Sequence, residues 1–161
     1  MGKPLNLLSV EKPQTAGLVP PVYEDPAPDT FATSPMILLV EGGPLAQKLH
    51  RRSLEKLGCQ VQRVDNAQAA IDASAKTDYD AMLLDYNLPD KNGDTVIQAI
   101  RVREQKTQHY LPIILAATHS TESELAACRA AGSTCVLLKP ISIEDLRKAL
   151  QTCGFDVQGD A

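Results

Sequence analysis

The fold of this 161-residue chain is decided by one stretch, AMLLDYNLPDKNGDTVIQAIRVREQ, at residues 81–105. It opens with the short apolar run Ala81–Leu84, which is typical of a buried strand. A polar segment rich in Asp, Asn and Pro follows, and such residues favour a turn or loop. From Gly93 to Gln105 the apolar residues recur at helical spacing. The stretch therefore predicts a strand, a loop and a helix in succession.

The same alternation extends to both sides of this stretch. Four more apolar runs are found, at Met36–Val40, Gln60–Val64, Pro112–Leu115 and Thr134–Leu138. Stretches with helical spacing lie between and after them, at Pro44–Leu57, Ala67–Lys76, Glu122–Ala131 and Ile143–Cys153. Five strands that alternate with five helices indicate an α/β fold, an open parallel sheet covered by helices on both faces.

Two features refine the expected helices. Leu45, Leu49 and Leu57 fall on one face of the first helix, which predicts that this face is apolar. Gly58 and Gly132 stand where the first and fourth helices should end, and glycine commonly follows the last residue of a helix.

The first 35 residues differ from the rest in composition. Seven of the eleven prolines lie there, and proline at this density prevents regular hydrogen-bond ladders and favours extended backbone. The sequence therefore predicts a Pro-rich linker or tail at 1–35, one domain at 36–154 and a short C-terminal tail at 155–161.

Composition excludes several classes of function. The net charge of −4 and the scattered basic residues argue against nucleic-acid binding. No apolar run is long enough for a membrane helix, so this segment is expected to make no membrane contact, although its parent protein can still be anchored. The four cysteines form no ligand or C-x-x-C pattern, which favours reduced thiols in the cytoplasm. The histidines, His50, His109 and His119, are scattered and receive no phosphotransfer role.

Polar residues follow the apolar runs at the positions where a parallel sheet binds its ligands. These positions are Glu41-Gly42-Gly43, Asp85, Ala117-Thr118 and Lys139-Pro140. The carboxyl ends of parallel strands meet at one edge, so the side chains are expected to converge there. No G-x-G-x-x-G or G-K-[ST] motif is present, which leaves dinucleotide and nucleoside-triphosphate sites unsupported.

The converging residues suit one kind of chemistry. Two carboxylates, Glu41 and Asp85, offer the oxygen ligands that Mg²⁺ takes. A phosphoryl group transferred to Asp85 would need a nearby cation, and Lys139 is the one basic residue at these strand ends.

With these motifs in place, residues 36–154 resemble the receiver domain of two-component response regulators, of the kind attached to hybrid sensor histidine kinases. The matching segments are Val40-Glu41, Leu84 to Gly93, Leu111 to Ile114 and Leu138-Lys139-Pro140. The resemblance implies a flavodoxin-like, doubly wound sheet with strand order 2-1-3-4-5. It also implies that the chain takes part in a phosphorelay with a histidine kinase or a histidine phosphotransfer protein; homodimerisation is left open.

The resemblance also implies roles for individual residues. Asp85 would accept the phosphoryl group, and Lys139 would be its counter-ion. Glu41, Asp85 and the backbone carbonyl of Asn87 would bind Mg²⁺, and Pro140 would follow a cis peptide bond.

Three positions depart from the family pattern. Gly42 replaces a second acid, Ala117 replaces a hydroxyl residue, and Val136 replaces an aromatic residue. Thr118 is a candidate substitute for the hydroxyl, but a shift of one residue at a strand end points its side chain to the other face. Loss of one carboxylate is expected to weaken Mg²⁺ binding by about tenfold.

These departures leave an alternative within the same fold. A degenerate pseudo-receiver would never carry phosphate and would regulate a kinase or an output domain by contact alone. The domain is in neither case a stand-alone enzyme, although a parent chain can be a histidine kinase. A small flavodoxin-like enzyme is disfavoured because the acids already used are its only candidate catalytic groups.

Overall fold

The computed structural model describes residues 34–118 and 121–157 of the chain. The predicted Pro-rich segment at 1–35 therefore lies outside the described residues except for its last two positions. The same holds for residues 158–161 of the predicted C-terminal tail and for His119.

Strands and helices alternate along the described part of the chain, as the apolar runs predict. The elements are β1 (Met36–Val40), α1 (Pro44–Lys56), β2 (Gln60–Val64), α2 (Ala67–Lys76), β3 (Ala81–Asp85), α3 (Gly93–Thr107), β4 (Ile113–Ala117), α4 (Glu122–Ala131), β5 (Cys135–Leu138) and α5 (Ile143–Thr152). The ends of several elements differ by one or two residues from the prediction. The largest extension in a strand is at β4, which runs on through Ala116 and Ala117, because alanine carries little strand signal of its own.

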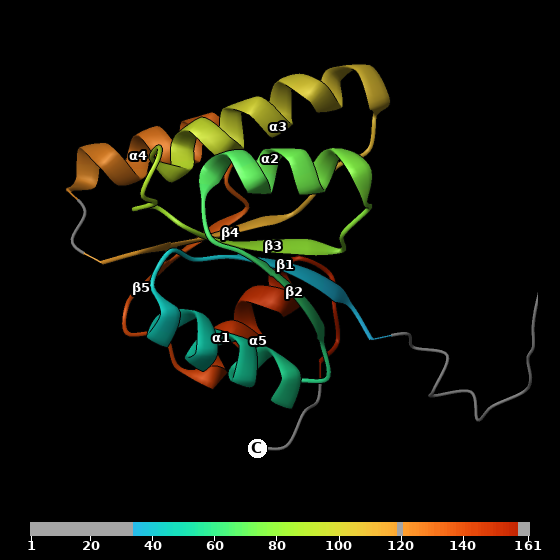
Figure 1. Ribbon diagram of the computed structural model, residues 1–161, viewed down its shortest axis with the longest axis vertical. Helices are drawn as coiled ribbons and strands as arrows, with labels where there is room; N and C mark the ends of the chain where they lie inside the picture. Colours follow the sequence, from blue (N-terminus) through green and yellow to red (C-terminus); the bar gives the residue numbers. More distant parts are fainter. Residues whose placement is uncertain (1–33, 119–120, 158–161) are drawn as a thin grey trace, which may run out of the picture. The chain divides into compact units, whose positions relative to one another are not determined.

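The five strands form one parallel sheet in the order β2-β1-β3-β4-β5. This arrangement confirms the predicted fold class and strand order. Helices α2, α3 and α4 cover one face of the sheet, and α1 and α5 cover the other (Figure 1). Over the described residues, none of these helices combines the length and the apolar character needed to cross a bilayer.

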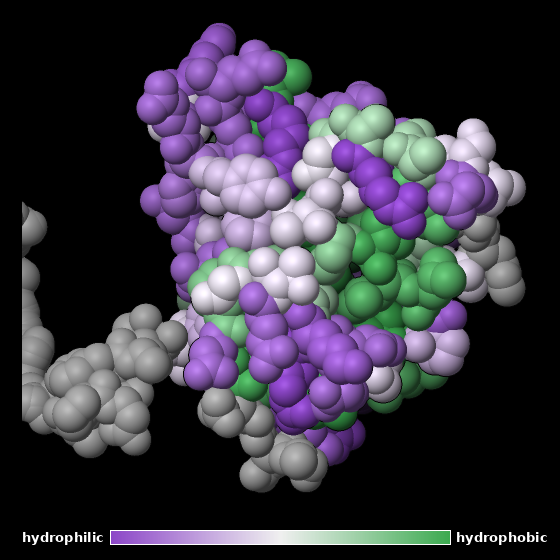
Figure 2. All heavy atoms as spheres, turned by 180° about the vertical axis from the view of Figure 1, so that it is seen from behind, coloured by the Kyte–Doolittle hydropathy of each residue, from purple (hydrophilic) through white to green (hydrophobic). Residues whose placement is uncertain are grey.

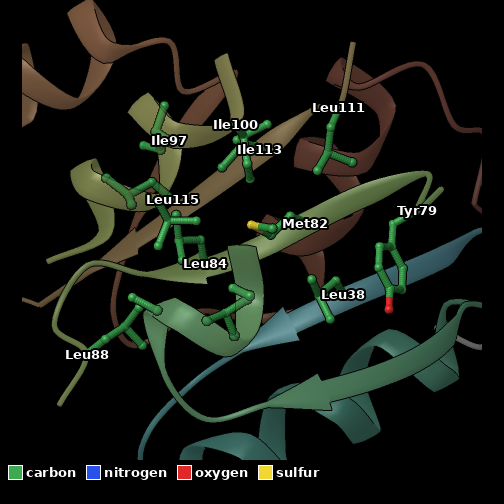
Figure 3. Packing of buried hydrophobic residues seen from close by; sticks show 14 of the residues in the cluster. Leu38, Tyr79, Met82, Leu84, Leu88, Ile97, Ile100, Leu111, Ile113 and Leu115 are labelled. Carbon is green, nitrogen blue, oxygen red and sulfur yellow. The ribbon is translucent and has the colours of Figure 1, made fainter. Parts of the chain in front are cut away.

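Alternate residues of the central strands fill two separate cores. Leu38, Met82 and Leu115 point to the face covered by α2, α3 and α4, where Ile97 and Ile100 meet them (Figure 3). The residues next to them in the strands point to the other face; examples are Leu39, Leu83 and Ile114. Because both faces are covered, β1, β3 and β4 are apolar at nearly every position.

The edge strands are less buried than the central ones. Strand β2 has three exposed residues, and β5 is only half-buried along its length, with Leu138 57% exposed. Seen from behind, apolar side chains gather at mid-height on the side of the sheet where β5 lies (Figure 2). The weaker burial explains why β2 reads as a polar sequence, Gln-Val-Gln-Arg-Val, and still forms a strand.

The apolar face of α1 differs from the prediction. Leu57 is buried as expected, but Leu45 and Leu49 are 69% and 53% exposed. The buried residues of the helix are instead His50 and Leu54. Helical spacing shows which residues share a face but not which face is buried. Here the face with Leu45 and Leu49 is exposed to solvent and does not pack on the sheet.

Two predicted helix ends are confirmed. Gly58 and Gly132 adopt φ angles of 92° and 116°, and the left-handed backbone region is the one in which glycine ends a helix without strain.

Candidate functional site

The site lies at the carboxyl edge of the sheet, where three backbone positions are fixed by extensions of the strand ladder. The amide of Glu41 donates to the Val64 carbonyl at 3.1 Å, and the amide of Tyr86 donates to Ala116 at 2.8 Å. The amide of Lys139 donates to Ala117 at 2.8 Å. Each functional residue therefore stands at, or directly beside, a residue that is still paired with the neighbouring strand.

The side chains of Glu41, Asp85 and Lys139 meet at this edge. Nζ of Lys139 lies 3.1 Å from Oε2 and 3.2 Å from Oε1 of Glu41, and 3.3 Å from Oδ1 of Asp85. Both carboxylates are buried, with exposed fractions of 3% for Glu41 and 6% for Asp85. The predicted residues thus form one cluster with two negative charges and one positive charge.

The pKa values of Glu41 and Asp85 are shifted in opposite directions. The pKa of Asp85 is raised to about 6, chiefly by burial and in addition by the hydrogen bond and the charge of Glu41. The charge and hydrogen bond of Lys139 act in the opposite direction and lower this pKa. Burial would also raise the pKa of Glu41, but hydrogen bonds with His50, Asp85 and Lys139, together with the Lys139 charge, lower it to about 2. In the metal-free pocket, Glu41 is therefore the acid that stays ionised, and Asp85 is the acid that takes up a proton first.

The loop after β3 is held tightly against the helix that follows it. A Cβ atom on Gly93 would lie 3.0 Å from the Asp85 carbonyl oxygen and 3.0 Å from Cα of Tyr86, so only glycine allows α3 to begin this close to the site. The amide of Asn87 donates to Oδ1 of Asp85 at 3.3 Å. Asp90 accepts from the amides of Ala67 and Gln68, which ties the same loop to the start of α2.

Comparison with known proteins assigns the described domain to a family. The model of the response regulator receiver domain matches residues 37–151. The chain belongs to the receiver domain family. The predicted resemblance is thereby confirmed, and the function of the chain lies in two-component phosphorelay signalling.

The relatives include sensor kinases much longer than this chain. The sensory/regulatory protein RpfC of Xanthomonas campestris is 34% identical over 91 residues, which are 56% of this chain and 12% of RpfC. The sensor protein GacS of Pseudomonas syringae is 29% identical over 130 residues, 80% of this chain and 14% of GacS. The chain therefore spans only about an eighth of the length of these relatives.

Solved structures of other receivers are similar in fold. The receiver domain of the sensor histidine kinase PA1611 from Pseudomonas aeruginosa is 29% identical, with a TM-score of 0.67 over 76% of this chain and 99% of that one. It was crystallised with a magnesium ion coordinated in its active site cleft. The chemotaxis response regulator CheY4 of Vibrio cholerae is 25% identical, with a TM-score of 0.68 over 75% of this chain and 99% of CheY4.

In this receiver domain the position of the second acid is crowded by Pro89. A Cβ atom added to Gly42 would lie 3.0 Å from Cδ of Pro89 and 3.5 Å from the Asp65 carbonyl oxygen. A side chain at this position would therefore fit only if Pro89 moved by a few tenths of an ångström.

The other two departures from the family pattern lie on β4 and β5. Ala117 is fully buried at the end of β4, and Val136 is half-buried in β5 and packs against the core. Thr118 is exposed and borders a groove that also includes Lys139. The peptide bond between Lys139 and Pro140 is cis, as the resemblance implies.

The donor set fits a hard divalent cation through oxygen alone. Carboxylates of Glu41 and Asp85, with the carbonyl of Asn87, are the ligands that Mg²⁺ takes in proteins, and water would complete its shell. Among the described residues, however, no three His, Cys, Asp or Glu side chains are already gathered around one point. The Lys139 ammonium group, which contacts both carboxylates, balances part of their charge.

Sequence reasoning overlooked one residue at this site. His50 of α1 is buried, and its Nδ1 lies 3.5 Å from Oε1 of Glu41. Its spacing of four residues from Leu54 was the available signal, because residues four apart share a face of a helix.

Proposed function

We propose that this receiver domain accepts a phosphoryl group from a phosphohistidine onto Asp85. The observation that carries the proposal is the buried carboxylate of Asp85 at the carboxyl edge of the sheet, with Nζ of Lys139 3.3 Å from its Oδ1. Asp85 is a buried nucleophile, and the Lys139 cation beside it can neutralise the negative charge of a transferred phosphoryl group.

The transfer breaks one bond and forms one bond. A carboxylate oxygen of Asp85 attacks phosphorus, the bond from phosphorus to the donor imidazole nitrogen breaks, and the donor histidine leaves with the electron pair of that bond. The product is an acyl phosphate on Asp85. Lys139 neutralises charge on the phosphoryl oxygens, and its position is kept by the hydrogen bond of its amide to Ala117.

Glu41, Asp85 and the Asn87 carbonyl are the residues that would hold Mg²⁺ in this domain. When bound, the ion would supply positive charge to the transferring phosphoryl oxygens. We expect binding to be weak, because Gly42 stands where a second carboxylate would otherwise contribute.

The phosphohistidine donor is proposed to dock over α1 and the segment after β5. The exposed side chains of Leu45 and Leu49 lie on this side, and a groove of about 590 Å³ is lined by Leu49, Pro140 and Ile141 together with Lys139. An apolar surface directly beside the acceptor lets a helical histidine kinase or phosphotransfer protein bring its histidine to Asp85. The four free thiols favour the cytoplasm as the compartment, within either a hybrid sensor kinase or a response regulator.

The test is phosphorylation of the purified protein, followed by intact mass spectrometry. Incubation with a small-molecule phosphodonor or a phosphohistidine protein, with Mg²⁺ present, should add the mass of one phosphoryl group. Asp85→Asn should abolish the addition, whereas Asp65→Asn, which changes an exposed aspartate directly after β2, should leave it intact. Equal labelling of the native protein and the Asp85→Asn variant would refute the proposal.

The alternative is a pseudo-receiver that acts by contact alone. It is favoured by the missing acid at Gly42 and by the buried Ala117, which offers no hydroxyl. Absence of any mass addition from either donor, with a folded protein and saturating Mg²⁺, would favour this second function.

A further inference from the structure

The core-facing side of α1 contains a polar residue that the phosphoryl transfer outlined above does not use. His50 is 8% exposed, is one of the two buried residues of α1 together with Leu54, and lines the groove that also includes Lys139. Burying an imidazole among apolar side chains costs free energy unless it finds a polar partner. The nearest one is Glu41, whose Oε1 lies 3.5 Å from Nδ1 of His50.

The contact has a defined direction. Within the described residues, Nδ1 of His50 is buried and makes no hydrogen bond of normal length, and its contact with Oε1 of Glu41 is 3.5 Å long. A nitrogen that faces a carboxylate oxygen is favoured to carry the proton, because a bare nitrogen lone pair would repel that oxygen. The proton of His50 is therefore expected on Nδ1, where it is directed at Glu41 across a contact longer than a normal hydrogen bond.

Glu41 is thereby held from two sides. Lys139 reaches both of its oxygens, at 3.2 and 3.1 Å, and His50 reaches Oε1. A metal ion that binds Glu41 would approach oxygens that already face the Lys139 ammonium group and the His50 imidazole, and the positive ends of both groups disfavour a nearby cation. Donors and metal therefore compete for the same carboxylate, and removing a donor must favour the metal.

We propose that His50 is a positioning residue that keeps Glu41 turned toward Lys139 and so lowers the affinity of the pocket for divalent metal ions. The inference rests on the proposed function in one respect, the role of Glu41 as a metal ligand. It adds to the effect of Gly42: the pocket lacks one acid, and its remaining partner acid is already engaged by donors of the chain itself.

Calorimetric titration of the protein with Mg²⁺ tests the proposal. His50→Leu, which fills a similar volume without a donor, should bind Mg²⁺ about twofold to threefold more tightly, the lower end of the worth of one hydrogen bond, because the contact is long. His50→Gln, which can still donate to Glu41, should stay closer to the native affinity than His50→Leu. Arg52→Ala, an exposed change on the same helix, is the control for general effects on α1. An unchanged or weaker affinity in His50→Leu overturns the proposal.

A second measurement needs no variant. The ¹⁵N chemical shifts of the His50 imidazole in the metal-free protein should show a protonated Nδ1, and saturation with Mg²⁺ should shift this signal. A proton on Nε2 alone in the metal-free protein would overturn the proposal.

Neither measurement depends on phosphoryl transfer. Tighter Mg²⁺ binding by His50→Leu in a protein whose Asp85 takes no phosphate would leave this inference standing and remove the proposed function. Phosphorylation of Asp85 together with unchanged Mg²⁺ affinity in His50→Leu would support the proposed function and overturn this inference.

Discussion

Nζ of Lys139 lies 3.3 Å from Oδ1 of Asp85, although a whole strand, β4, separates β3 from β5. The lysine side chain spans this strand because its backbone is fixed to Ala117 and its aliphatic stem is largely buried. The same nitrogen contacts Glu41, so one cation serves two carboxylates. Most of the chemical behaviour expected of the site follows from this shared cation.

Lys139→Met should impair both stability and phosphoryl transfer. Without the cation, the buried pair of acids loses its charge compensation, and the free energy of unfolding should fall by about 1–3 kcal/mol. Phosphorylation of Asp85 should slow by about tenfold or more. Urea unfolding and phosphorylation time courses measure the two effects. Lys106→Met, at an exposed position of α3, is the matched control, and an equal effect there would contradict the assigned role.

Protonation of Asp85 should make the free energy of unfolding depend on pH. Its pKa is raised from 3.8 to about 6 in the metal-free folded protein, so the folded state binds this proton more tightly than the unfolded state. The unfolding free energy should therefore rise as the pH falls from about 7 toward 4.5, by about 1–2 kcal/mol from this group.

Below that range the sign reverses. The pKa of Glu41 is lowered from 4.5 to about 2, so its stabilising contribution is present above pH 4.5 and is lost as the pH falls through 2. Thermal or urea unfolding in a chelating buffer across this range provides the measurement. Asp85→Asn should be more stable than the native protein at neutral pH and should lose the rise between pH 7 and 4.5; a native-like profile in this variant would contradict the assignment.

The pattern of apolar runs was sufficient to predict the sheet, because both faces of β1, β3 and β4 are covered and their sequences are therefore continuously apolar. The strand order came from the family resemblance, since periodicity says nothing about which strands are neighbours. The convergence of Asp85 with Lys139 came from their positions after strands whose carboxyl ends share one edge. What the pattern could not supply was the orientation of α1. Leu45 and Leu49 lie beside the carboxyl edge, where the helix surface meets solvent, and His50 takes the position nearest Glu41.

Restoring the missing acid should strengthen metal binding. Gly42→Asp adds a carboxylate beside Glu41, and we expect Mg²⁺ affinity to rise by about tenfold or more. The gain should be partly offset by the close contact with Pro89, which lies 3.0 Å from the new Cβ position. Gly43→Asp adds the same charge one residue later, where the new Cβ meets only Ala46 at 4.0 Å. Isothermal titration of both variants decides the point, and equal gains would show that charge alone, and not position, is responsible.

The close approach of Pro89 to Gly42 also marks a limit of sequence reasoning. The absence of an acid at position 42 is visible in the sequence, but the occupation of its space by a residue of the loop after β3 is not. That contact joins two segments far apart in the chain.

The four cysteines should differ in their rates of alkylation. Burial and the charge of Asp80 raise the pKa of Cys59 to about 11, and burial raises the pKa of Cys128. A hydrogen bond from Cys153 lowers the pKa of the half-buried Cys135, against the effect of burial. Cys135 should therefore react with iodoacetamide before Cys59 and Cys128 do. Peptide mapping after short exposures of the native protein gives the order, and earlier labelling of Cys59 would contradict it.

The central claim is that Asp85 is the residue that carries the phosphoryl group. Borohydride reduces an aspartyl phosphate to homoserine, and tandem mass spectrometry then locates the altered residue in the sequence. After incubation with a phosphohistidine donor and Mg²⁺, the proposal predicts homoserine at position 85 and nowhere else. Homoserine at another aspartate, or an unaltered Asp85 in protein that has gained phosphoryl mass, would contradict it.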